Sequence, residues 1–199
     1  MPLPRRSARP LALVTATVAA LTACGEPTAT LAPAPAAFGA SAQVEGSSAQ
    51  NQLLATIRRA TAPYHRVEAA LAAGYTFIAP CHYSAAGGKG YQYRKPALTD
   101  GLIDPAQPEI LLYEPQENGE LKLVGVAFLL LANAWDAAHG APPTLGDQPF
   151  IDRRAPGSLG PPFPNYALYV SVWRHNPDGM YAQYNPTVSC EFAAESIRE

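Results

Sequence analysis

The sequence has no apolar segment long enough to cross a membrane. The apolar run near its start, Leu11–Leu21, is too short, because a spanning helix takes about 20 apolar residues. Val124–Ala134 comes nearest elsewhere, but it is also short and follows a strand-like pattern. The sequence therefore predicts no membrane-spanning helix.

The recognisable motifs of catalysis and metal binding are also missing. The sequence has no G-x-S-x-G nucleophile motif and no H-x-H or H-E-x-x-H pair. Its histidines stand apart from one another, at His65, His82, His139 and His175. The run Gly87–Gly90 lacks the spacing of a phosphate-binding loop and favours a mobile loop. We therefore predict no catalytic residue, no metal and no cofactor.

The N-terminal segment has the features of a secretory signal. Three arginines precede the apolar run, small residues follow it, and no acidic residue comes before Glu26. Leu21-Thr22-Ala23-Cys24 then resembles the lipobox of bacterial lipoproteins. That resemblance implies cleavage after residue 23 and lipid attachment to Cys24. The alternative is an ordinary cleaved signal with a chance cysteine.

The lipoprotein signal predicts where the protein is located and that it is attached to a membrane through its N-terminal lipid. The chain should be exported and held by its lipid at the outer face of the inner membrane or at the outer membrane. Gly25 rather than an aspartate follows the anchor, which favours the outer membrane in a host that has one. Residues 24–50 are rich in Ala, Pro, Ser and Gly and predict a lipidated, flexible tether.

The cysteine count agrees with an oxidising compartment. With Cys24 assigned to lipid, Cys81 and Cys190 remain as an even pair, which predicts one disulfide. Two buried free thiols are the alternative. A metal pair is disfavoured, because only His82 adds a neighbouring ligand type.

The charge balance argues against nucleic acid as a partner. Removing residues 1–23 takes away three of 14 basic residues and none of the 16 acidic ones, which leaves a net charge of −5. Nucleic-acid binding needs a basic surface, and none is expected here.

Periodicity predicts a single α+β domain over residues 51–199. Apolar residues from Leu53 to Leu71 repeat at helical spacing and predict one amphipathic helix packed on a sheet. Pro63 interrupts this helix, and we favour a kink over a second helix capped by Thr61. Residues 109–114, 121–131 and 166–173 predict antiparallel strands, with a hairpin turn at Asn118-Gly119. Long Pro- and Gly-rich loops, including residues 142–164, connect the elements.

An ordered set of short segments extends over most of residues 60–190. These segments are Tyr64-His65, Ala73-Gly74-Tyr75, Cys81, Pro96-Ala97-Leu98, Asp100-Gly101, Pro108–Tyr113, Leu123–Val126, Gly146–Phe150, Trp173, Asn176–Gly179, Asn185-Pro186 and Cys190. Together they resemble an uncharacterised family of secreted bacterial proteins of unknown function.

The same resemblance implies a site that this chain has lost. Members of the family carry His, Glu, His and His where this chain has Gln92, Ala127, Asn165 and Tyr169. Such a set on sheet faces would suit a divalent metal, somewhat as in cupins. Alanine cannot coordinate a metal, and amide oxygens are weak ligands for such ions.

Aromatic residues are numerous beyond these positions, either as core packing or as the lining of a cleft. The candidate cleft consists of His65, Gln92, Asn165, Tyr169 and Trp173. The sequence thus favours a membrane-anchored envelope lipoprotein whose non-catalytic domain binds or scaffolds a small molecule or an envelope protein. The alternative is a metal-dependent, cupin-like envelope enzyme.

Overall fold

The computed structural model describes residues 38–157 and 160–199, with side chains from Ser48 onward. The predicted signal segment, Cys24 and residues 25–37 lie outside these described residues. In the part that is described, no helix is both long enough and apolar enough to cross a membrane. Residues from Phe38 to Glu199 form one compact unit.

The helical segment is divided into three pieces rather than kinked. Helix α1 spans Phe38–Thr61, the 3₁₀ turn η1 spans Ala62–His65, and helix α2 spans Val67–Ala72. Pro63 lies in η1, where its missing N–H interrupts the α-helical bonding. Helix α1 also begins inside the segment expected to be a tether, since extending an existing helix costs little per residue.

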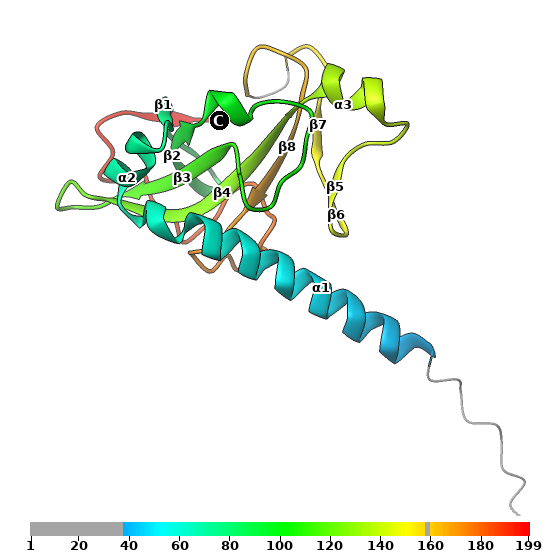
Figure 1. The fold of residues 1–199 in the computed structure, drawn as a ribbon. Coiled ribbons are helices and arrows are strands. Elements are labelled where there is room, and N and C mark those ends of the chain that lie inside the picture. Colours follow the sequence, from blue (N-terminus) through cyan, green and yellow to red (C-terminus); the bar gives the residue numbers. More distant parts are fainter. Residues whose placement is uncertain (1–37, 158–159) are drawn as a thin grey trace, which may run out of the picture. The chain divides into compact units, whose positions relative to one another are not determined.

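A curled, mostly antiparallel sheet forms the body of this mixed α+β fold (Figure 1). Its order is β7-β8-β4-β3-β2-β1-β9, and among these described strands β1 and β9 are the one parallel pair. The strands are β1 Thr76–Ser84, β2 Gly87–Arg94, β3 Ile110–Pro115, β4 Leu121–Leu131, β7 Ile151–Arg153, β8 Asn165–Val170 and β9 Ser196–Arg198. The short elements are η2 Pro96–Leu98, α3 Ala132–Ala138, and the separate pair β5 Thr144–Leu145 and β6 Gln148–Pro149.

Alternation along the central strands divides the core between the two faces of the sheet. One face carries Leu111, Val126 and Leu168, which pack with Leu54 and Ile57 of α1. The other face carries a second apolar cluster that includes Ile110, Leu112, Ala127, Leu129, Ala167 and Tyr169. The helices cover the first face, and the second face carries the cavity described below.

The predicted disulfide is confirmed. Cys81 of β1 and Cys190 are joined, with their Cα atoms 5.6 Å apart. The two alternatives, free thiols and a metal pair, are thereby excluded. The disulfide joins the C-terminal loop to β1, the strand that pairs with β9.

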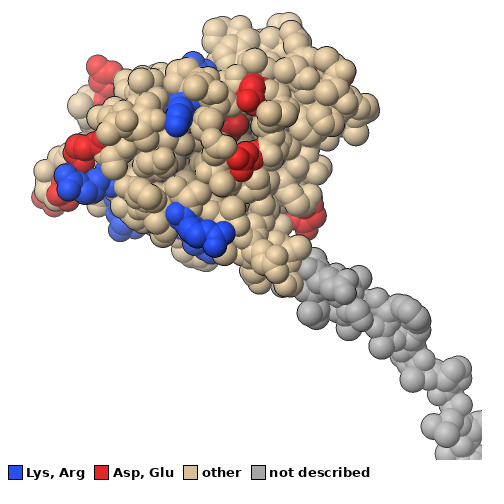
Figure 2. All heavy atoms as spheres, viewed as in Figure 1, with Lys and Arg blue, Asp and Glu red and all other residues tan. Residues whose placement is uncertain are grey.

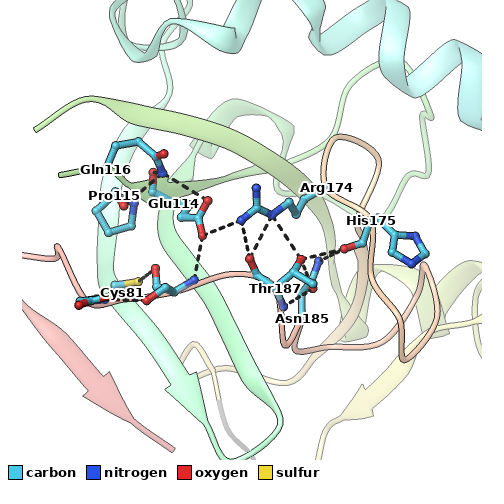
Figure 3. A network of polar contacts seen from close by, with 10 residues as sticks. Cys81, Glu114, Pro115, Gln116, Arg174, His175, Asn185 and Thr187 are labelled. Carbon is cyan, nitrogen blue, oxygen red and sulfur yellow. Dashed lines mark hydrogen bonds and ion pairs between the residues drawn. The ribbon is translucent and has the colours of Figure 1, made fainter. Parts of the chain in front are cut away.

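A polar network holds the same loop from the other side (Figure 3). Arg174 contacts the Glu114 carboxylate at 3.4 Å, and the backbone N–H of Ser189 donates to that carboxylate at 2.9 Å. Arg174 also donates to the Thr187 carbonyl oxygen at 2.6 Å. Asn185 donates to the His175 carbonyl oxygen at 3.1 Å. These contacts fix residues 174–190 against the end of β3.

Candidate functional site

A cavity of about 650 Å³ opens on the sheet face opposite the helices. Strands β2, β3, β4 and β8 contribute its floor, while β1, β9 and residues 160–163 contribute its walls. Much of the lining is apolar, and includes Ile78, Ile110, Leu129, Phe163, Ala167 and Ile197. A volume of this size is typical of small-molecule sites.

The charged residues that line this cavity are mostly cationic. They are Lys89, Arg94, Arg153 and Arg198, with Glu199 as the single acidic residue. Lys89 and Arg153 are only 4% and 7% exposed, which is rare for charged side chains. The chain as a whole has a net charge of −2, and the face in Figure 2 shows both signs in separate spots. The cavity is therefore locally positive in a weakly acidic protein.

Glu199 is held by three donors at one end of the cavity. Lys89 Nζ lies 2.9 Å from Oε1 and 2.7 Å from Oε2. His82 Nδ1 also contacts Oε1, and the Tyr184 hydroxyl donates to Oε2. Burial alone would raise the pKa of the Glu199 carboxyl, but these hydrogen bonds together lower it to about 2. The group is thus an anion at all ordinary pH values.

Arg153 has no comparable acidic partner among the described residues. Its Nη1 and Nη2 lie 3.4 and 3.5 Å from the Tyr169 hydroxyl, and its guanidinium stands 5.5 Å from the centre of that ring. With its amide oxygen turned toward the two cations, Gln183 accepts from Arg153 at 3.2 Å and from Lys89 at 3.3 Å. A neutral amide does not balance the charge. Of these two buried cations, Lys89 is paired with Glu199, whereas the contacts of Arg153 among the described residues are with the neutral groups of Tyr169 and Gln183.

A further cation points to the same imbalance. Arg94 lines the cavity from β2, and its Nε is buried without a hydrogen-bond partner in the described part of the chain. Buried polar groups are normally satisfied, and an exception requires an explanation. A bound anion would supply the missing acceptor and the missing charge.

The candidate cleft residues fall into two groups. Gln92 and Tyr169 line the cavity, and Ala127 lies beside Tyr169 as its direct partner across β4 and β8. His65 and Trp173 do not reach it. Their rings contact each other at 4.3 Å, and Trp173 packs with the core on the helix-covered side. Of the five candidate cleft residues, His65 and Trp173 thus lie outside the lining of this cavity and contact each other instead.

Asn165 also lies outside the cavity lining, although it is on the same strand as Tyr169. The two positions are four residues apart, which separates them by about 13 Å along a strand. Asn165 is buried instead, and its Nδ2 donates to the Phe163 carbonyl oxygen at 2.7 Å. The four positions attributed to a family metal site therefore do not all reach one point.

The most important charged residues were missed by sequence reasoning. Lys89 lies in the glycine-rich run expected to be a mobile loop, but this run forms β2 and Lys89 is buried in it. Arg153 and Glu199 carry no local signal, because they come from β7 and from the residue after β9. Within residues 48–157 and 160–199, no group of three or more His, Cys, Asp or Glu side chains could hold a metal.

Comparison of the chain with protein-family models, with curated proteins and with solved structures finds no match.

Proposed function

We propose that this protein is an exported lipoprotein, anchored through Cys24, whose folded domain binds a small amphipathic anion without converting it. The observation that carries the proposal is the cavity, where an apolar floor adjoins more buried positive charge than Glu199 balances. The anchor is supported by the basic head, the apolar run and the Leu-Thr-Ala-Cys sequence. The resemblance to a family of secreted bacterial proteins supports export alone.

The lining suits a ligand with two distinct ends. Ile110, Leu129 and Ala167 offer apolar surface, whose burial against a ligand contributes about 25 cal/mol per Å². Lys89, Arg94 and Arg153 make this lining positive, which favours a ligand with an anionic end, because a buried charge gains most from a partner of opposite sign.

The chemistry present in the cavity supports binding rather than catalysis. Glu199 is the one carboxylate among its described lining residues, and it is already engaged by Lys89, Tyr184 and His82. A general base needs a free basic atom within reach of a substrate proton, and this carboxylate has a strongly lowered pKa.

Binding is tested with 1-anilinonaphthalene-8-sulfonate, an amphipathic anion whose fluorescence rises in apolar surroundings. The folded domain should bind about one equivalent. Ala79→Trp fills the cavity from a partly exposed wall position and should abolish binding, while Ala106→Trp, at an exposed site elsewhere, should not. Equal binding by the two variants, or no saturable binding by the unmodified domain, would contradict the proposal.

The anchor is tested by expressing the full chain in a bacterium that is fed a labelled fatty acid. Cys24→Ala should abolish the label and leave the signal uncut or miscut, because the thiol that receives the lipid is gone. Thr28→Ala, four residues downstream, should keep the label and be cut normally. Labelled, membrane-bound Cys24→Ala protein would show that the anchor lies elsewhere.

A further inference from the structure

The side chains that hold Glu199 are arranged as a carboxylate-binding site. Its donors come from three separate parts of the chain, namely His82 of β1, Lys89 of β2 and Tyr184 of the C-terminal loop. Each carboxylate oxygen receives two of these contacts, with Lys89 bridging both oxygens. Lys89 also lies 4.7 Å from the Tyr184 ring centre and 5.5 Å from that of Tyr169, so its position is fixed from several sides.

The strand that delivers Glu199 to this site is held weakly by comparison. Strand β9 has only three residues, all exposed, and it pairs with β1 alone at the edge of the sheet. The Glu199 backbone N–H adds one bond to the Tyr83 carbonyl oxygen at 2.9 Å. Segments with few buried apolar contacts and with exposed backbone hydrogen bonds open at a low free-energy cost.

We propose that Lys89, His82 and Tyr184 bind the carboxylate of the protein's ligand, and that Glu199 occupies this site as an internal competitor until the ligand displaces it. This inference rests on the proposed binding function and names its ligand class, a monocarboxylate with an apolar chain. The chain would lie on Ile110, Leu129 and Ala167 of the cavity floor.

Charge balance makes such an exchange reasonable and selects the ligand. Withdrawing Glu199 alone would leave Lys89 buried and unpaired, which is strongly unfavourable. A ligand carboxylate restores the pair, so that one anion replaces another. The donor set is matched to two oxygens, and a phosphate would leave further oxygens without donors at this end. A neutral alcohol would leave the charge of Lys89 unbalanced.

The first experiment rescues a deleted side chain with a small molecule. Glu199→Ala removes the carboxylate and should lower the Tm, and sodium acetate should then raise the Tm of this variant by filling the vacated site. Sodium chloride at equal ionic strength should not raise the Tm of this variant. As a control, Glu191→Ala, at an exposed position nearby, should have the same Tm as the unmodified protein in either salt. Adding Lys89→Met to Glu199→Ala should abolish the acetate effect.

The second experiment measures the competition directly by calorimetric titration with decanoate and with decanol. Glu199→Ala should bind decanoate at least about tenfold more tightly than the unmodified protein, because no internal anion has to be displaced. Decanol should bind weakly and equally to both. If Glu199→Ala folds only with acetate present, that requirement itself supports the proposal, and Glu199→Gln serves for the titration.

Two results would overturn this inference. One is an acetate effect no larger than that of chloride, together with equal decanoate affinity in the variant and the unmodified protein. The other is equal affinity for decanol and decanoate. In either case, the proposed binding function would still hold if the domain binds 1-anilinonaphthalene-8-sulfonate and Ala79→Trp abolishes that binding. If the domain does not bind it, both the proposed function and the displacement of Glu199 would be refuted.

Discussion

Glu109 is a carboxyl group that the fold buries almost completely, with only 2% of the residue exposed. Burial raises its pKa to about 8, against the lowering effect of a hydrogen bond from the Leu129 backbone N–H at 3.0 Å. Asp100 and Asp104 raise the pKa further. The group is therefore mostly protonated near neutral pH, whereas in the unfolded chain it ionises near its ordinary value of 4.5.

This difference predicts that stability falls as pH rises between about 4.5 and 8. In that range the folded state keeps a proton that the unfolded state has released, so raising the pH favours unfolding. The contribution is fully present below the unfolded pKa and is lost as pH passes the folded pKa. Urea unfolding at pH 5 and pH 8 should show a loss of a few kcal/mol that Glu109→Gln reduces. Glu117→Gln, on the exposed hairpin turn, should leave the loss unchanged, and equal behaviour of the two variants would contradict the prediction.

Single residues show both the reach and the limit of prediction from sequence. Gln92 and Tyr169 could be placed near a common site only through the resemblance to the secreted family, which singles out both positions. Lys89, Arg153 and Glu199 could not, because they meet only after three distant elements come together in the sheet. A lysine among glycines suggests a solvated loop, and nothing local shows that its charge is buried.

At the scale of elements, the apolar segments were predictable, whereas the glycine-rich strand β2 and the edge strand β9 were not. Strands β3, β4 and β8 are buried along nearly their whole length, and their apolar residues produce a clear sequence pattern. Strand β2, with the sequence GGKGYQYR, has little apolar content, and β9 is fully exposed. Cross-strand pairing, the Cys81–Cys190 bond and the contacts of Glu199 position these strands, and all of them are non-local.

Substituting two glycines allows the energetic cost of backbone strain to be compared with the cost of a steric clash in the sheet. Gly90 of β2 and Gly119 of the β3–β4 turn have similar positive φ angles, +83° and +80°. A Cβ at Gly90 would lie 2.4 Å from the Tyr113 carbonyl oxygen, whereas at Gly119 nothing lies within 4 Å. Gly119→Ala should cost about 1–2 kcal/mol from its left-handed backbone alone. Gly90→Ala should cost clearly more, because β2 has to move away from β3.

Urea unfolding of both variants measures this difference, and 1-anilinonaphthalene-8-sulfonate binding gives a second readout. Gly90 adjoins Lys89, so a displaced β2 should also weaken binding in the Gly90 variant, while the Gly119 variant should bind as the unmodified domain does. Equal costs for the two substitutions would show that β2 adapts without strain.

For the whole molecule, the arrangement of charge matters more than its sum. The sequence has 16 acidic and 14 basic residues, yet the cavity is lined by Lys89, Arg94, Arg153 and Arg198 and by a single acidic residue, Glu199. Between residues separated by several ångströms in a partly buried site, such charges interact by amounts of the order of kcal/mol. The cavity should therefore attract anions and repel divalent cations.

The ligand types at the positions compared with a metal site, rather than this field, lead to the prediction that the purified domain retains no stoichiometric transition metal. Gln92, Ala127 and Tyr169 supply neither imidazole nor carboxylate, and zinc, copper and iron bind these ligand types in proteins. Elemental analysis after export and dialysis should find less than about 0.1 equivalent of any one metal.

Replacing both Lys89 and Arg153 with glutamine distinguishes two possible causes of this absence, charge repulsion and the lack of a ligand set. If repulsion alone excludes metal, this double variant should take it up, whereas a missing ligand set leaves it empty, and we expect the second result. About one equivalent of a single metal in the unmodified domain would contradict the prediction and favour a metal-dependent enzyme, because some ligand set would then have to assemble that the described residues do not show.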